Sequence, residues 1–331
     1  MKFGIEFVPR EPFWRTILYA VEAERLGFDY VWVTDHYNNR NVFTTLTATA
    51  IYTRSIKLGI GVTNPYIRHP AATASATASL AEIAPDRVAL GIGAGDRATL
   101  EGIGIGIVKP LQAMKESVYM IRELLAGRPV SLDGSIFKVK SASLNFRCRS
   151  YIPIYIGAQG PQMLSLAGEI GDGVLINASH PEDFKHAIGY VRMGVEKSSR
   201  DIKSVDIAAY TAFSVADDEA RAVEASRQVV AFIVAGSPET VLERHHIDLE
   251  LASRIRGLIV SGRFDEAFKS VTMDMIDAFS VSGSPSSVAK RVEECLKAGV
   301  TQFVVGSPIG PQPYEAIKII SSKIMPIFKP E

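Results

Sequence analysis

The stretch that decides the fold reads Ile152-Pro-Ile-Tyr-Ile-Gly-Ala-Gln-Gly-Pro-Gln-Met-Leu164. It opens with an apolar, β-rich run, two glycines break that run, and an apolar helical pattern begins at Pro161. Proline is favoured at the first helical position because its missing N–H would have no partner there. The stretch therefore predicts a strand over 152–156, a glycine turn at 157–160 and a helix over 161–170.

The same strand-turn-helix unit recurs along the whole chain. We expect its strands at about 3–8, 30–33, 56–60, 88–92, 152–156, 173–176, 205–213 and 302–305. These strands are apolar throughout rather than alternating, which is typical of parallel sheets covered by helices. Eight units predict an α/β fold, a (β/α)8 TIM barrel formed as a single domain over residues 1–331. An open doubly wound sheet is the alternative, and the lack of an early G-x-G-x-x-G fingerprint disfavours it.

Two segments interrupt the repeat. Residues 127–147 look like a β excursion with a turn at Asp133-Gly134. Residues 236–282 are almost entirely helical and too long for one crossover, so we expect a helical insertion. Within it, His245 and His246 lie beside charged residues, which indicates a charge-rich surface.

The composition narrows the class of partner. Thirty-six basic and thirty-six acidic side chains cancel, which argues against nucleic acid and against an anionic membrane surface, and favours a small molecule. Cys148 and Cys295 have no C-x-x-C spacing, so we expect reduced thiols and neither a disulfide nor a zinc site. No apolar stretch approaches the roughly 18 residues of a membrane span, and a cytoplasmic location is expected.

In a barrel, the residues at the carboxyl ends of the strands share one mouth, so positions far apart in sequence can be grouped. The group is polar and rich in glycine. Its members are Glu6, Asp35, His36, Gly61, Val62, Thr63, Asn64, Gly93, Gly95, Asp96, Gly157, Ala158, Gln159, Gly160, Asn177 and 306–310.

Glu6 is the sharpest candidate in this group, because it stands in an otherwise apolar strand. A carboxylate without a partner would be costly there, and a carboxyl kept protonated by desolvation would suit general acid catalysis. The alternative is a rim position with a basic partner. Asp96 follows the run Gly91-Ile-Gly-Ala-Gly95, whose small residues would let a flat ring approach the backbone.

The turn at 157–160 is a candidate phosphate cradle, because the first N–H groups and the dipole of the following helix favour an anion. An ordinary strand-to-helix turn is the alternative. His36 is either a ligand contact or a hydrogen-bonded rim residue, and its surroundings lack the spacing of a metal site. No G-x-S-x-G elbow occurs and neither cysteine ends a predicted strand, so a bound cofactor must perform the difficult step.

Taken together, these residues resemble the luciferase-like family of barrel oxidoreductases, and within it the pterin reductases of methanogenic archaea. The motifs that carry the resemblance span nearly the whole chain in order. They are Met1-Lys-Phe-Gly-Ile-Glu-Phe-Val-Pro9, Val33-Thr-Asp-His36, Gly91-Ile-Gly-Ala-Gly-Asp96, Ile152-Pro-Ile-Tyr-Ile-Gly-Ala-Gln-Gly-Pro161, Gly171-Asp-Gly-Val-Leu-Ile-Asn-Ala178, Val241-Leu-Glu-Arg-His245 and Gly306-Ser-Pro-Ile-Gly-Pro311.

The resemblance implies hydride transfer from reduced coenzyme F-420, an 8-hydroxy-5-deazaflavin, to methylenetetrahydromethanopterin, giving the methyl-pterin. It implies a dissociable coenzyme, no metal and no bound FMN or FAD. Glu6 then resembles the acid that protonates a pterin nitrogen, and Asp96 a polar orienter or second acid. Gly61-Val62 resembles the place of a non-prolyl cis peptide against the deazaflavin face.

The remaining cofactor-binding residues are also implied by the resemblance. Asp35, Thr63, Asn64 and Asn177 are similar in position to residues that line the ring and the ribityl chain, with His36 as a further contact, and 157–160 to the phosphate loop. The alternatives are an F-420-dependent alcohol or sugar-phosphate dehydrogenase, an FMN-dependent monooxygenase, or a catalytically silent flavin- or pterin-binding relative. A homodimer or homotetramer is expected.

Overall fold

Eight parallel strands carry the fold, and a computed structural model describes them within residues 1–329. They are β1 (Lys2–Phe7), β2 (Tyr30–Val33), β3 (Lys57–Thr63), β4 (Val88–Gly93), β7 (Ile154–Gly157), β8 (Gly173–Asn177), β9 (Asp206–Val215) and β11 (Gln302–Ile309). Their hydrogen-bonded order is β9-β11-β1-β2-β3-β4-β7-β8, and β8 pairs again with β9. The predicted (β/α)8 barrel is confirmed.

The described chain divides into two compact units. The larger contains residues 4–176 and 187–208, and the smaller contains residues 1–3, 177–186 and those from 209 onward. The expectation of a single domain stays a prediction, and each unit is described by itself.

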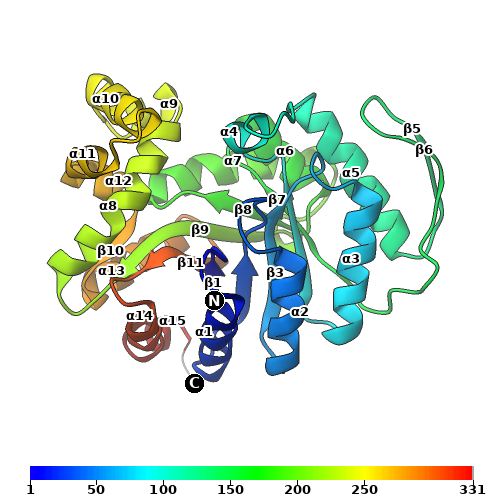
Figure 1. Cartoon of the computed structure of the whole chain (residues 1–331), viewed down its shortest axis with the longest axis horizontal. Helices are drawn as coiled ribbons and strands as arrows, with labels where there is room; N and C mark the ends of the chain where they lie inside the picture. The colour runs from blue at the N-terminus through cyan, green and yellow to red at the C-terminus, as the bar shows by residue number, and fades with distance from the viewer. Residues whose placement is uncertain (330–331) are drawn as a thin grey trace. The chain divides into compact units, whose positions relative to one another are not determined.

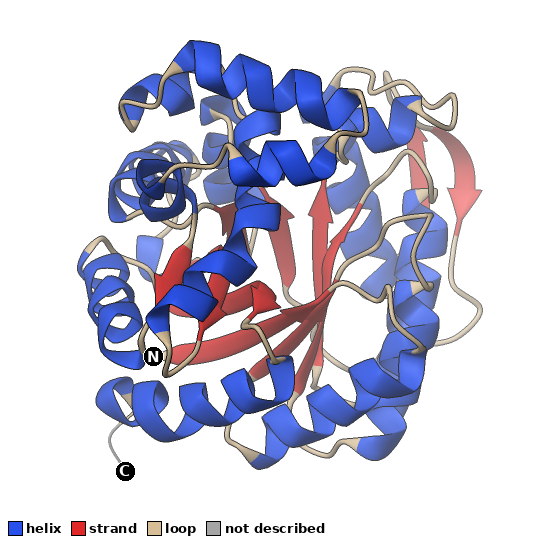
Figure 2. Ribbon diagram, turned by 60° about the vertical axis from the view of Figure 1, so that its left-hand side comes forward, coloured by secondary structure: helices blue, strands red, loops and turns tan. Residues whose placement is uncertain are grey.

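In the larger unit, helices lie along the outer side of the strands (Figures 1 and 2). They are α1 (Phe13–Arg25), α2 (Val42–Tyr52), α3 (Pro70–Ile83), α4 (Arg97–Glu101), α5 (Pro110–Leu125), α6 (Pro161–Ile170) and most of α7 (Pro181–Lys197). Four of these helices, α3, α5, α6 and α7, begin with the proline that marks a helix start. The strands bury nearly all their side chains, as the apolar runs predict.

The β excursion expected at 127–147 is an antiparallel hairpin of β5 (Val130–Asp133) and β6 (Lys138–Ala142), next to α5 (Figure 1). Glu116 of α5 holds its turn, because its carboxylate accepts the N–H groups of Ser135 (2.8 Å), Ile136 (3.1 Å) and Phe137 (2.8 Å). Burial works to raise the pKa of Glu116, but these hydrogen bonds outweigh it and lower the pKa. The hairpin is thus fixed to the barrel by one carboxylate.

The helical insertion expected at 236–282 is confirmed in the smaller unit. Its helices are α9 (Glu239–Arg244), α10 (Leu249–Val260), α11 (Phe264–Lys269) and α12 (Met273–Phe279), and with α8 (Glu219–Gly236) they enclose a hydrophobic cluster of their own. The last residues of the predicted range differ. They form a short strand, β10 (Val281–Gly283), because Val281 pairs in parallel with Phe213 of β9. The unit ends with α13 (Pro285–Lys297), α14 (Pro313–Ile319), a π-helical turn (Ile320–Ile324) and α15 (Met325–Phe328).

The expectation of a charge-rich surface at His245 is wrong. The His245 side chain is only 6% exposed, and its Nε2 lies 2.8 Å from Asp183 Oδ2. Arg244 donates to the other oxygen of Asp183 at 2.6 Å. The ring of His245 also packs edge-on against His180, so this motif joins the insertion to the start of α7. Throughout residues 1–329, no helix is both long and apolar enough to cross a bilayer.

Candidate active site

Glu6 lies on the inner face of the sheet. It stands opposite Trp32 in the parallel pairing of β1 with β2, and residues opposite each other in a parallel pair point to the same face. The Trp32 ring meets the Tyr155 ring edge-on at 5.1 Å, although β3 and β4 separate their strands. The shared face is therefore the concave one. Glu6 is 7% exposed, so the predicted acid is buried there.

Three glycines shape the same face nearer the carboxyl ends of the strands. We call Gly91, Gly93 and Gly157 the glycine floor. A Cβ added to each would lie within 3.0, 3.0 and 3.2 Å of a γ carbon of Val62. Val62 follows a non-prolyl cis peptide at Gly61-Val62, as the resemblance implies, and the β3–β4 register shifts between Ile60 and Thr63. Val62 therefore rests on all three glycines, which leave room for its side chain.

Asp35 and Thr63 are brought together by Arg68, a residue that the sequence analysis missed. The Arg68 guanidinium donates to Asp35 Oδ2 at 2.8 Å and to Thr63 Oγ1 at 3.4 Å, and its Cζ lies 4.7 Å from the centre of the Phe43 ring. The side chains of Arg68 and Asp35 are 21% and 14% exposed. The available signal was an arginine five residues beyond the end of β3, but the sequence does not indicate which side chains it contacts. The cluster links the ends of β2 and β3.

Asn64 shapes the loop after β3 with its side chain. Its Oδ1 accepts the N–H groups of Tyr66 (3.1 Å) and Ile67 (3.0 Å), which leaves its amide nitrogen as the group for a ligand. His36 is half-buried directly after Asp35.

Asp96 is exposed, and its Oδ2 accepts the N–H of Thr99 at 2.7 Å. It therefore caps the short helix α4. Its role as orienter or second acid stays a prediction.

The turn at 157–160 has the expected form. Gly160 precedes α6, no side chain caps that helix, and a Cβ at Gly160 would meet nothing within 4 Å. Gln159 and Gly160 are exposed, whereas Ala158 is buried and its N–H donates to Leu175 in the sheet. The helix N-terminus, rather than Ala158, is therefore the part that fits an anion.

Asn177 ends β8 with an exposed side chain. It belongs to the smaller unit, whereas the other predicted catalytic and cofactor-binding residues belong to the larger one.

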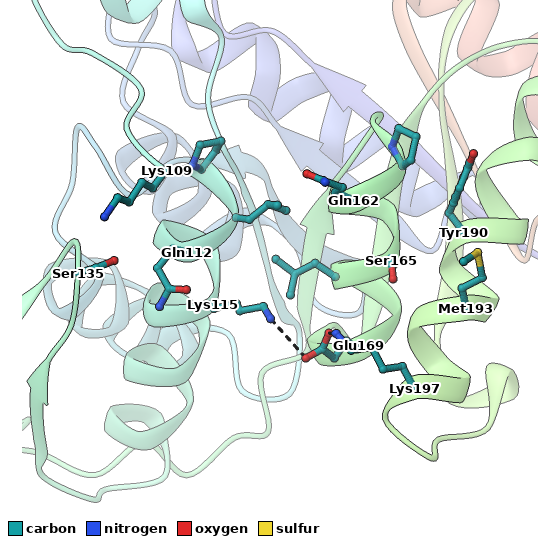
Figure 3. Close-up of a pocket in the computed structure, with 14 residues that line it drawn as sticks. Lys109, Gln112, Lys115, Ser135, Gln162, Ser165, Glu169, Tyr190, Met193 and Lys197 are labelled. Atoms are coloured by element: carbon teal, nitrogen blue, oxygen red, sulfur yellow. Dashed lines mark hydrogen bonds and ion pairs between the residues drawn. The ribbon is translucent and has the colours of Figure 1, made fainter.

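A separate groove of about 1080 Å³ lies between α5, α6 and α7 (Figure 3). None of the predicted site residues lines it. Its one acidic side chain, Glu169, pairs with Lys197 at 3.0 Å and with Lys115 at 3.6 Å. Lys109 also lines the groove, so lysines outnumber carboxylates there. In the part of the chain that the structure describes, no three His, Cys, Asp or Glu side chains cluster as metal ligands would.

The profile of the luciferase-like monooxygenase family matches residues 1–302. The chain is 52% identical over 98% of its length to 5,10-methylenetetrahydromethanopterin reductase of Methanolobus tindarius, all of which is covered. The solved coenzyme F-420-dependent tetrahydromethanopterin reductase of Methanopyrus kandleri is 44% identical and superposes with a TM-score of 0.95, covering 99% of each chain. An F-420-dependent secondary alcohol dehydrogenase, 23% identical with a TM-score of 0.82 over 98% of each chain, shares the fold. The chain belongs to the luciferase-like monooxygenase family.

Proposed function

We propose that this chain is a 5,10-methylenetetrahydromethanopterin reductase, which transfers hydride reversibly between coenzyme F-420 and the pterin. The observation that carries the proposal is its identity with the Methanolobus reductase along nearly the whole of both chains. The buried Glu6 beside an inner face floored by glycines agrees with it.

The residues on the inner face fit a flat coenzyme. The glycine floor gives a ring access to the backbone, and Gly61 with Val62 would press on the ring from the β3 side. We assign Asp35, His36, Thr63 and Asn64 to the ring and ribityl chain, with Asn177 from β8, and 157–160 to the phosphate. When bound, the coenzyme supplies the hydride. We propose that it dissociates after each turnover and that neither a metal nor a bound flavin takes part.

Glu6 is the group to which we assign proton transfer. Its carboxyl would donate to a nitrogen of the pterin, which would open the ring to a methylene-iminium ion able to accept hydride. Because Glu6 is buried on the inner face, bulk water would be kept away from its carboxyl group during proton transfer. The Arg68–Asp35–Thr63 cluster would fix the neighbouring strand ends, so that the reacting groups keep their geometry.

The test is the replacement Glu6→Gln, assayed by mixing reduced coenzyme F-420 with methylenetetrahydromethanopterin and following coenzyme oxidation. We expect turnover to fall at least about 100-fold, the low end for general acid catalysis, while coenzyme binding survives. Glu11→Gln is the matched control, since Glu11 is exposed and pairs with the exposed Arg15 at 2.6 Å. Turnover close to that of wild type in Glu6→Gln would remove the proton-donor role. A wild-type protein that oxidises an alcohol or a sugar phosphate instead, or that binds without turnover, would exclude the reductase.

We also propose a cytoplasmic homodimer or homotetramer. Helix α2 contains no charged residue, yet Ile51 and Tyr52 are 57% and 65% exposed, and Trp14 of the adjoining α1 is 50% exposed. A surface helix without charges is typical of one that packs against another subunit. Light scattering after size exclusion should give a mass of two or four chains, and a monomer would contradict the proposal.

A further inference from the structure

Thr34 carries a buried hydroxyl for which the described part of the chain offers no hydrogen-bond partner. The residue is 7% exposed and directly follows β2. Most buried side-chain hydroxyls in native proteins do have a partner, because leaving one unpaired costs its desolvation. An orphaned hydroxyl at a strand end of the candidate site therefore calls for a partner that comes from outside the chain.

The register of the sheet places Thr34 among the proposed catalytic groups. Its N–H donates to Phe7 O at 3.2 Å, so the β1–β2 ladder continues one residue past Val33. Side chains alternate along a strand, and Thr34 therefore shares the inner face with Trp32 and Glu6. On the other side, Val33 pairs with Ile60, which sets Thr34 opposite Gly61.

The neighbour at Gly61 has no side chain that could hydrogen-bond to the hydroxyl. Gly61 begins the Gly61-Val62 segment, and Val62 rests on the glycine floor. The Thr34 hydroxyl thus lies between the β1 position that holds the acid and the β3 segment assigned to the coenzyme ring. A ring on the floor would extend toward it.

We infer that the Thr34 hydroxyl contacts the coenzyme, by hydrogen-bonding a polar atom of the deazaflavin ring system. A threonine hydroxyl can donate to a ring carbonyl or accept from a ring N–H, so the contact suits a heteroaromatic ring with both kinds of group. The inference rests on the proposed function and deepens it. It adds Thr34 to Asp35 and His36 as a third coenzyme contact from the Val33-Thr-Asp-His36 motif.

The experiment compares Thr34→Val, Thr34→Ser and Ser214→Ala by titrating each protein with coenzyme F-420 alone and by thermal unfolding. Valine keeps the shape and removes only the hydroxyl, whereas serine keeps the hydroxyl and removes a methyl group. Ser214 of β9 is the matched control, since its hydroxyl is also buried without a partner among residues 1–329 and no role in the site is assigned to it.

For Thr34→Val we expect coenzyme Kd to rise by about 3- to 10-fold, the range for one neutral hydrogen bond, with Tm unchanged or higher. Thr34→Ser should keep Kd within about twofold of wild type and lower Tm, because it loses a buried methyl group. Ser214→Ala should leave Kd unchanged.

A coenzyme Kd in Thr34→Val within about twofold of wild type would overturn the inference, and would indicate that water or the pterin satisfies the hydroxyl. An equal loss of affinity in Thr34→Ser would also overturn it, because shape rather than the hydroxyl would then be responsible. A wild-type protein that binds no coenzyme would refute the proposed function itself. A wild type that binds and turns over normally, with an unaltered Thr34→Val, would refute the Thr34 contact alone.

Discussion

A methyl group added to each glycine of the floor should lower stability by a different amount, because the three Cβ atoms would meet their nearest neighbours at different distances. At Gly157 the new Cβ would lie 3.2 and 3.4 Å from the γ carbons of Val62, and at Gly93 it would lie 3.0 Å from one of them. At Gly91 it would lie 2.3 Å from the backbone oxygen of Ile60. A half-buried side chain can shift by a few tenths of an ångström, whereas a strand carbonyl cannot.

The distances translate into an order of stability loss. Overpacking lowers stability by about 1–3 kcal/mol. Replacing glycine by alanine also restricts the unfolded chain, which raises stability by about 0.4–1 kcal/mol. We therefore expect Gly157→Ala to cost about 0–1 kcal/mol and Gly93→Ala about 1–2 kcal/mol. Gly91→Ala must displace the β3 backbone, and its cost should exceed about 3 kcal/mol.

Val62→Ala separates the two kinds of clash. It removes both γ carbons that meet the new Cβ at Gly93 and Gly157, but it leaves the Ile60 oxygen in place. Alone it should cost about 1 kcal/mol, since Val62 is half-buried. In double variants it should rescue Gly93→Ala and Gly157→Ala by a coupling of about 0.5–2 kcal/mol, and it should not rescue Gly91→Ala.

Urea unfolding gives these free energies, and coenzyme titration of the same variants measures the floor as a binding surface. We expect coenzyme affinity to fall with Gly93→Ala and Gly157→Ala even where stability is restored by Val62→Ala, because the added methyl groups occupy the face assigned to the ring. Two results would refute the reasoning. One is a Gly91→Ala protein as stable as Gly157→Ala, and the other is zero coupling between Val62 and Gly93.

Three further predictions concern polar contacts. Arg68→Met should weaken coenzyme binding and lower the free energy of unfolding by about 1–3 kcal/mol, because Asp35 loses its charged partner. Arg68→Lys should restore part of both, as measured by coenzyme titration and urea unfolding. Burial works to raise the pKa of Asp183, but hydrogen bonds from His245 and Arg244 outweigh it and lower the pKa. The Asp183 carboxylate therefore stabilises the fold fully above its unfolded-state pKa of about 4, and this stabilisation is lost as pH falls through the lower folded-state pKa. Asp183→Asn should therefore lose stability at neutral pH and show a flatter decline in acid, and an unchanged pH profile would contradict the pairing. Glu116→Gln should speed hydrogen exchange across 135–137 without altering coenzyme Kd.

The strands were predictable because each is a local pattern. Their apolar runs, the glycines that end them and the prolines that begin helices lie within a few residues of one another, as in 152–164. The boundaries moved by up to four residues, as at the end of β11, since pairing rather than composition ends a strand. β10 escaped prediction because three residues carry no periodicity, and only pairing with Phe213 makes them a strand.

Residues of the site were predictable where the backbone itself is special. The glycines before Asp96 stand out in the sequence, and the cis peptide at Gly61-Val62 is where the resemblance places it. Partnerships between distant side chains were not predictable. Arg68 meets Asp35 across 33 positions and His245 meets Asp183 across 62, and no local pattern reports which rotamers converge.

The glycines of the inner face make room for two different kinds of neighbour. Gly59 lies against the Trp32 ring, where an added Cβ would come within 2.1 Å of it, so this glycine makes room for a large side chain. Trp32 stacks on Tyr30 and meets Tyr155, whose hydroxyl donates to Asp206 at 2.7 Å. These aromatic rings fill the interior toward the amino ends of the strands.

Nearer the carboxyl ends of β4 and β7, the glycine floor carries no side chains of its own on the inner face. Glu6 on β1 and Thr34 after β2 are polar groups on the same face. A substitution in the aromatic layer should alter unfolding before it alters coenzyme affinity, and Gly157→Ala, the mildest of the glycine-floor substitutions, should do the reverse. This order would fail if the coenzyme were held outside the barrel mouth.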